Sequence, residues 1–546
     1  MKKVFRGIMV GVLATSMLVT MVGCGKTAGD NQTGNSGVGS TQKTQAVSAK
    51  EPNKDAANTN TTDKQITIAL GSEPSTLWGA ACGKTENEEC MIGAAMRDSL
   101  VSVDPKTNAV KPALAKSWEW VDATHCKFVL RDDVTMTDGK PLVADDVVYT
   151  VNVWKKYSPS TDTGSYVSGA VANDAHTVTI EFNVAAPGLL NMLAWSNFGI
   201  VSEAEVNAVG GIDAAQKNPV LGSGKYKFKE WKNGQYILLE RNDNYWDKDY
   251  KGYYKDIKIT FTADAASREM SVESGDADVA YDLPISQAAT YTKSDTVSTY
   301  IYTNSAVNHL WYNMGAKAGE ATKNIKVRQA IDKALDFDAI AQVGTAGFKK
   351  PATAYEDENS QYYTKSEKDR KRDIEGAKAL LAEAGYKDGL QLNLLGLASD
   401  NPVYTVVQAN LKDVGITVNI KTPDTAQFVG GAFSGDYDII IVQEDLSVIA
   451  PSSLAFFKSV CINGPGVCVG GPKWTTNEID SLVANIISET DKEKAKDMLH
   501  QLDVTMHDNM LCSNLYSVMM ASVTAKDLKG CQTRERGYID LTSFYK

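Results

Sequence analysis

"LAKSWEWVDATHCKFVLRDDVTMTDGKPLVADDVVYTVNVWKK", residues Leu114–Lys156, places a strand, a turn and the start of a helix next to one another. The strand is "KFVLRDDV", and the turn is Asp138-Gly139, whose glycine accepts a positive φ angle at little steric cost. A helix is predicted to begin near Asp145, because apolar side chains then recur at helical spacing. These side chains are Val147, Val148, Val151 and Trp154.

The aspartates of this stretch could serve either a metal site or the local fold. Asp145 and Asp146 fall in the first predicted helical turn, where carboxylates accept hydrogen bonds from free N–H groups and complement the helix dipole. A metal site would need side chains converging from a turn and a helix start, with His125 as the nearby histidine. We therefore interpret these aspartates as structural.

Strand and helix patterns alternate along most of the remaining chain, which predicts an α/β fold. Hairpins are expected at Asn173–Phe182 and Ser223–Asn242. Other strands are predicted at 65–70, 256–263, 276–283, 390–397, 416–422, 435–445 and 514–523. Helices are predicted at 266–275, 326–342, 373–386, 404–415 and 491–509.

The quoted stretch resembles the signature region of the large extracytoplasmic solute-binding proteins of ABC importers, the oligopeptide, dipeptide and nickel class. The pattern of that class is roughly LA-x-SW, F-x-LR and DG-x-P-L-x-A-x-DV. Met136-Thr137 departs from it, since an aromatic residue or histidine usually precedes the Asp-Gly. Further matching segments are "GSGKYKFKEW" (222–231), "ESGDADVAYDLP" (273–284), "YNMGAKAGEATKNIKVRQAIDKAL" (312–335) and "AKALLAEAGYKDG" (377–389).

The resemblance implies a two-lobed periplasmic-binding-protein-like α/β fold, with a two-strand hinge and an extra domain inserted in the N-terminal half. Lobe I is then expected at 65–100 together with 219–305 and 521–546. The inserted domain is expected at 101–218 and lobe II at 306–520. Lobes of this kind close on a ligand by hinge motion.

The N-terminus has the pattern of an export signal. Residues 1–23 begin with basic residues and continue as an apolar run too short to span a bilayer comfortably. "MVGC", ending at Cys24, resembles the bacterial lipobox and implies a diacylglycerol on Cys24, although ordinary secretion is the alternative. Residues 24–64 hold hardly any aliphatic side chain and are expected to form a disordered tether.

Charge and cysteine content narrow the class of protein. The formal net charge of -11 argues against a nucleic-acid partner, which normally requires a basic surface. Seven cysteines remain after Cys24, so at least one thiol stays free. Cys82 with Cys90, and Cys461 with Cys468, could each close a small loop.

The resemblance also implies which residues line the cleft between the lobes. In peptide-binding members an aspartate pairs with the ligand's α-amino group, and its place here falls near Ser447, whereas the acids are Glu444 and Asp445. A loop adjustment, or a ligand without a free amine, would account for that shift. The expected ligand-binding residues are Trp78, Asn87, Tyr281, Asn308, His309, Trp311, Tyr312, Glu444, Asp445 and Ser447.

No nucleophile elbow, zinc-protease motif or phosphate loop is present, so we expect no enzyme, no catalytic residue, no cofactor and no resident metal. The resemblance implies a lipid-anchored subunit on the outer face of a bacterial membrane that delivers peptides to an ABC permease and its ATPase. One alternative is a binder of nickel, a metal chelate or another small solute, for which His309 is a candidate ligand group. The other is a peptide-sensing surface lipoprotein.

Overall fold

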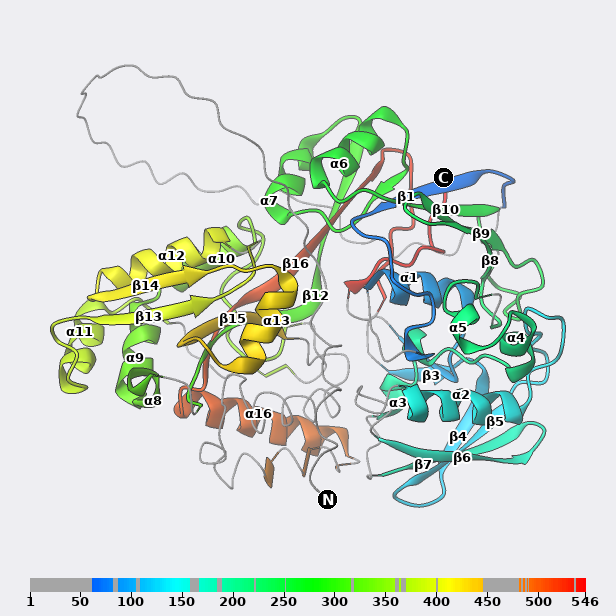
Figure 1. Cartoon of the computed structure of the whole chain (residues 1–546), viewed down its shortest axis with the longest axis horizontal. Coiled ribbons are helices and arrows are strands. Elements are labelled where there is room, and N and C mark those ends of the chain that lie inside the picture. The colour runs from blue at the N-terminus through cyan, green and yellow to red at the C-terminus, as the bar shows by residue number, and fades with distance from the viewer. Residues whose placement is uncertain are drawn as a thin grey trace.

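The computed structural model describes residues 61–81, 87–104, 109–157, 166–183, 189–219, 222–250, 252–315, 319–358, 363–364, 370–398, 401–444, 481–482, 485–486, 489, 491–534 and 537–546. Figure 1 shows a mixed α/β molecule with two lobes, as the sequence predicted. Within these ranges, every helix is too short or too polar to cross a lipid bilayer.

One ten-stranded sheet runs through both lobes in the order β14-β13-β15-β12-β16-β11-β1-β10-β9-β8. Its strands are β1 (Gln65–Leu70), β8 (Tyr226–Lys232), β9 (Tyr236–Arg241), β10 (Asp256–Phe261), β11 (Val279–Ala280), β12 (Val297–Tyr312), β13 (Leu390–Leu395), β14 (Ile416–Lys421), β15 (Ile439–Glu444) and β16 (Cys512–Ala525). We call the half from β11 to β8 lobe I and the half from β14 to β15 lobe II. The strands β12 and β16 belong to both.

In lobe I, β1 pairs in parallel with β10 and β11, and α6 (Ala265–Ser274) connects these two neighbours. Alternate side chains of β1 enter different cores, with Ile66 and Ile68 on one face and Ala69 on the other. The C-terminal tail, residues 526–546, supplies the first of these cores with Leu528, Cys531, Ile539, Leu541 and Phe544.

A buried ion pair fixes the first long helix, α1 (Asn87–Met96). Nη2 of Arg97 lies 3.1 Å from Oε1 of Glu89, and neither side chain is exposed. Nη1 of Arg97 also donates to the carbonyl of Leu77 at 2.8 Å. Burial lowers the pKa of Arg97, and the charge of Glu89 opposes this shift, so each ion depends on the other.

Lobe II is a parallel sheet with helices on both faces, the arrangement that suits strands buried on two sides. Ile439 and Ile441 of β15 enter one core, and Ile440 enters the other. The first core packs α9 (Ile325–Ala334), α10 (Phe337–Gly344), α11 (Ile374–Glu383) and α12 (Asn401–Lys412). The second packs α13 (Thr425–Ser434) and α16 (Lys492–Asp508).

The single helix predicted at 326–342 is wrong, because α9 and α10 are separate helices. The Asp336 side chain accepts a hydrogen bond from the Ala339 backbone N–H and so starts a new helix there. Leu335, expected on the stripe of the first helix, has an extended backbone with ψ of 135°.

A separate four-stranded sheet includes the two strands of the segment Leu114–Lys156. Its order is β4 (Ala115–Trp120), β5 (His125–Leu130), β7 (Thr177–Phe182) and β6 (Val167–Asp174), with α2 (Ala144–Tyr157) packed on it. Gly139 has φ of 86°, and Oδ2 of Asp146 accepts from the Val143 N–H at 3.0 Å. The structural interpretation of Asp146 is therefore confirmed.

Shorter elements are β2 (Val101–Val103), β3 (Val110–Pro112), α3 (Leu189–Met192), α4 (Glu203–Ala208), α5 (Ile212–Ala215), α7 (Ile285–Ala288) and α8 (Glu320–Lys323).

The two strands that join the lobes pair antiparallel along nearly their whole length, but their register shifts in the middle. Thr303 is opposite Met519, whereas Val307 is opposite Ser517, so β12 carries three residues in the interval where β16 carries one. Such an irregularity bends a strand pair locally and interrupts its ladder. Figure 1 shows both strands running between the lobes, so we call this interval the crossing.

A buried histidine lies at the lobe II side of the crossing. Nδ1 of His309 donates to Oδ1 of Asn514 at 2.8 Å, and its ring stacks on Tyr355 with centroids 4.2 Å apart. Its Nε2 is buried and has no hydrogen-bond partner among the described residues. Burial lowers the pKa of His309 to about 3. The imidazole ring of His309 is therefore uncharged in the folded protein at neutral pH.

We expect His309 to make the protein acid-sensitive. The unfolded chain titrates this histidine near pH 6.5 and the folded chain near pH 3, so the unfolded state binds more protons in between. Its contribution to stability is complete above pH 6.5 and falls as the pH drops, by up to about 1.4 kcal/mol per pH unit. Unfolding free energies of the wild type and His309→Gln, measured between pH 6.5 and 4.5, should show a shallower slope in the variant. Equal slopes would contradict this assignment.

Replacing Arg97 by methionine should destabilise the fold strongly. The change leaves the Glu89 carboxylate buried without its cation, which typically costs about 3–5 kcal/mol. Arg131→Met is the matched control, because Arg131 pairs with the exposed Asp133 and exposed pairs contribute about 0–1 kcal/mol. Denaturant unfolding followed by tryptophan fluorescence measures both, and similar losses in the two variants would refute the ranking.

Candidate functional site

The carboxyl ends of parallel strands lie together at one edge of each lobe. In lobe I these are the ends of β1, β10 and β11, and in lobe II those of β13, β14 and β15. Open α/β sheets bind ligands outside this edge, where loops and helix starts supply polar groups.

Both carboxyl edges adjoin the crossing. On the lobe II side, Glu444 at the end of β15 is opposite Val307. On the lobe I side, the backbone N–H of Leu283 donates to the carbonyl of Ala521, which is opposite Ile301. The shifted interval therefore lies between the two edges along β12. We call the region formed by both edges and the crossing the carboxyl-edge site.

In lobe I this site begins directly after β11. Tyr281 is buried, and its hydroxyl has no hydrogen-bond partner among the described residues. Asp282 follows with φ of 56°, a left-handed conformation that few residues other than glycine adopt. The Arg268 guanidinium supports this turn by donating to the Asp282 carbonyl at 2.7 Å, and to the carbonyls of Thr262 and Ala263 after β10.

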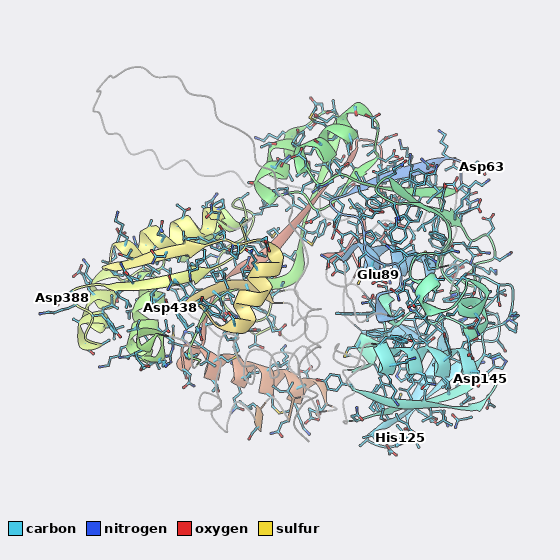
Figure 2. All side chains as sticks on the ribbon, viewed as in Figure 1. Asp63, Glu89, His125, Asp145, Asp388 and Asp438 are labelled. Atoms are coloured by element: carbon cyan, nitrogen blue, oxygen red, sulfur yellow. The ribbon has the colours of Figure 1, made fainter. Side chains whose placement is uncertain are left out.

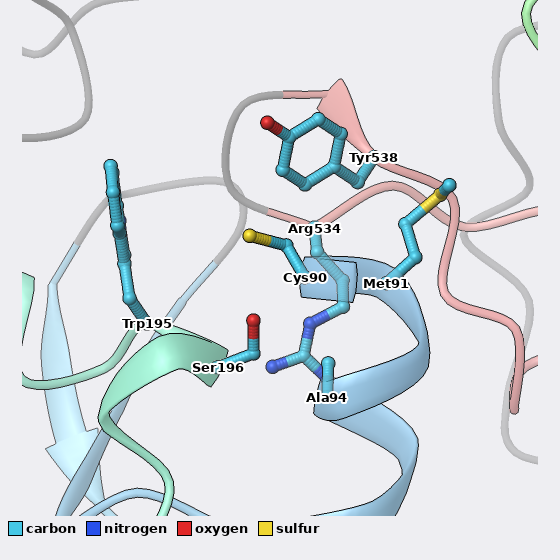
Figure 3. A pocket seen from close by; sticks show the side chains of 7 residues that line it. All are labelled: Cys90, Met91, Ala94, Trp195, Ser196, Arg534 and Tyr538. Atoms are coloured by element: carbon cyan, nitrogen blue, oxygen red, sulfur yellow. The ribbon is translucent and has the colours of Figure 1, made fainter. Parts of the chain in front are cut away.

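A pocket opens beside this edge, between α1, the segment after α3 and the C-terminal tail (Figure 3). The Tyr538 hydroxyl of the tail donates to Oδ1 of Asn87, the first residue of α1. The Ser72 hydroxyl, just after β1, donates to Glu88 at 2.5 Å and thereby ties this helix start to the carboxyl edge. The pocket is lined by Cys90, Met91, Ala94, Trp195, Ser196, Arg534 and Tyr538.

Several expected ligand-binding residues lie inside hydrophobic cores. Trp78 is fully buried in the core of the four-stranded sheet. Trp311 and Tyr312 enter opposite cores of lobe II, and the Tyr312 hydroxyl is 2.8 Å from Oγ of Ser513. Asn308, 5% exposed, is opposite Gln443 and Tyr516 in the ladders of β12. Their contact with a ligand stays a prediction.

Other expected residues are placed only in part or not at all. Asn87 and Tyr281 lie at the lobe I edge, as described above, and His309 lies beside the crossing. The Glu444 backbone ends β15, but its side chain lies outside the described residues, as do Asp445, Ser447 and the lipidation candidate Cys24. Cys82, Cys461 and Cys468 of the proposed loops also lie outside them.

The structure adds two residues to this region that were not among the expected ligand-binding residues, Asp282 and Arg534. Asp282 directly follows Tyr281, one of the expected ligand-binding residues, but the unusual φ angle of Asp282 gives no sequence signal. Arg534 reaches the pocket from the tail, far along the chain from α1. Within the described ranges, no group of three or more His, Cys, Asp or Glu side chains is arranged to hold a metal ion.

Known proteins resemble the chain over most of its length. It is 27% identical to the nickel-binding protein NikA of Staphylococcus aureus over 338 residues, 61% of this chain and 65% of that protein. It is also 27% identical to the oligopeptide-binding protein AppA of Bacillus subtilis over 428 residues, 72% of this chain and 76% of that protein. The fold matches the solved structure of NikA from Brucella suis in complex with Fe(III)-EDTA with a TM-score of 0.78 and 20% identity, covering 88% of this chain and 100% of the other.

The family comparison covers a central segment that includes the four-stranded sheet, the crossing strand β12 and most of lobe II. Residues 109–460, more than half of the chain, match the model of the bacterial extracellular solute-binding proteins, family 5 middle. The chain therefore belongs to family 5 of the bacterial extracellular solute-binding proteins.

Proposed function

We propose that this protein captures short peptides between its two lobes and delivers them to an ABC permease. The observation that carries the proposal is the crossing, where the carboxyl edges of both lobes meet beside the two shared strands. Two strands with a shifted register form a narrow connection about which lobes can rotate, and closure would enclose whatever lies between the edges.

Binding is proposed without chemical change. The family consists of solute-binding proteins, so the prediction that the chain is not an enzyme is confirmed. Delivery would then depend on the closed form being recognised by the permease, while the ATPase supplies the energy. Family membership supports an extracytoplasmic location for this step.

A peptide suits the chemistry of the carboxyl-edge site. A peptide backbone offers N–H and C=O groups at regular intervals, and the lobe I edge has the Asp282 carboxylate and the ends of three strands. The relative AppA is named for oligopeptide binding, which supports the same class. A nickel chelate, suggested by the name of NikA, is the competing outcome of the test below.

The unit boundaries and the anchor are part of the proposal. We infer that 65–100, 219–305 and 521–546 form the first lobe, 101–218 an inserted domain and 306–520 the second lobe. The separate hydrophobic core of the four-stranded sheet supports the inserted unit. Residues 1–23 would be removed, Cys24 would carry the lipid, and 24–64 would serve as the tether.

Short peptides should stabilise the purified protein and close its lobes. A ligand that binds only the folded state, at 100 times its dissociation constant, adds about 2.7 kcal/mol to stability. We therefore expect a pool of di- to pentapeptides to raise the thermal midpoint and to reduce the radius of gyration in X-ray scattering. Nickel with histidine is the comparison ligand. Stabilisation by the chelate alone would replace the peptide proposal by the metal-chelate function.

Substituting the proposed lipidation site should release the protein from the membrane. In a bacterium that processes lipoproteins, the wild type is expected in the membrane fraction, and Cys24→Ala in the soluble extracytoplasmic or medium fraction. Cys126→Ala is the control, because Cys126 is a buried free thiol of the four-stranded sheet. Membrane retention of Cys24→Ala would rule out the lipid anchor.

A further inference from the structure

We propose that lobe I contains a recognition site for a protonated amine of the ligand, and that Asp282 is its carboxylate. This inference rests on the proposed capture of peptides and names one chemical group that the captured peptide must present. It differs from the expectation of an acid near Ser447, because it assigns the amine contact to the opposite lobe.

The Asp282 carboxylate has no partner of its own within the described part of the chain. It accepts no hydrogen bond and forms no ion pair there, although the side chain is half-buried. Its nearest cation, Arg268, is already engaged with three backbone carbonyls, among them that of Asp282 itself. A half-buried carboxylate without a donor is costly, and a ligand cation would offset that cost.

The backbone holds this carboxylate in place. Tyr281 and Leu283 on either side are both buried, 3% exposed each, and they anchor opposite cores of lobe I. The Leu283 N–H is fixed to Ala521 of β16, and Arg268 holds the Asp282 carbonyl. The left-handed turn at φ of 56° therefore cannot relax without disturbing both cores, and strain of this kind gathers at ligand sites.

The local electrostatics favour a cation over an anion. Burial raises the pKa of Asp282, and the charge of Arg268 opposes the shift. Burial also raises the pKa of Tyr281 well above its ordinary value, so its phenol stays neutral beside the carboxylate. An incoming ammonium group would meet a desolvated carboxylate, and charge-assisted hydrogen bonds of this type are among the stronger ones.

A purely structural role for Asp282 is the competing explanation. Aspartate and asparagine both tolerate the left-handed region, and glycine adopts it without strain. Asp282→Asn and Asp282→Gly should therefore both keep the turn while removing the charge. This makes the substitutions informative about binding, because neither is expected to unfold the protein.

The test uses the full-length folded protein and three peptide pools that differ in lysine content and in N-acetylation. Binding is measured by native mass spectrometry and titration calorimetry. The first pool lacks lysine and has free N-termini, the second is the same pool after N-acetylation, and the third is N-acetylated with one lysine per peptide. Asp388→Asn is the matched control, because Asp388 lies at the far end of lobe II (Figure 2). Thermal unfolding checks that each variant remains folded.

We expect acetylation to weaken binding of the first pool to the wild type at least about tenfold. Asp282→Asn and Asp282→Gly should bind the first pool, with its free N-termini, more weakly than the wild type by a similar factor, and should bind the acetylated second pool almost as well as the wild type does. Asp388→Asn should bind both pools like the wild type. Binding of the third pool that depends on Asp282 would show that the site also accepts a side-chain amine.

Two results would overturn the inference, and they differ. If peptides bind and the Asp282 substitutions do not weaken binding of the free pool, the amine site at Asp282 is wrong and peptide capture stands, whether or not acetylation weakens binding. If no pool binds to any form of the protein, the proposed function fails and the amine site fails with it.

Discussion

The fold depends on two strands, β12 and β16, whose side chains must pack in the cores of both lobes. Each of β12 and β16 contributes one half of its length to lobe I and the other half to lobe II. Strands alternate their side chains between two faces, so a uniform ladder would fix the lobes as one rigid sheet. The shifted interval between Thr303 and Val307 interrupts that ladder while both halves keep their hydrogen bonds. The carboxyl edges of both lobes lie beside this interval, so the proposed binding of a ligand there would depend on the orientation of the lobes.

Most of the fold could be predicted from the sequence because its signals are local. The Asp138-Gly139 turn, the Asn233-Gly234 hairpin and the helix end at Gly275 follow from backbone preferences that act within a few residues. The break between α9 and α10 was not predicted, because apolar side chains continue at helical spacing through it. The Asp336 side chain nevertheless caps a new helix at this point. Resemblance to known proteins supplied the arrangement of lobes, which periodicity alone does not give.

The candidate site was predicted less well, since it depends on contacts between distant segments. Tyr281 and Asn87 are near the expected edge, but the sequence does not show that Trp311 and Tyr312 alternate into opposite cores of a sheet covered on both faces. The left-handed conformation of Asp282 arises only when Arg268, β11 and β16 are assembled around it. Arg534 approaches α1 from the end of the chain. These features require the folded arrangement and have no local signal.

The tail that completes lobe I also sets the order in which the protein can fold. Phe544 of the tail packs in the same core as Ile66 of β1. During synthesis this lobe lacks part of its interior until the tail, residues 526–546, has been made, whereas the strands of the four-stranded sheet and the helix α2 are already complete by Phe182.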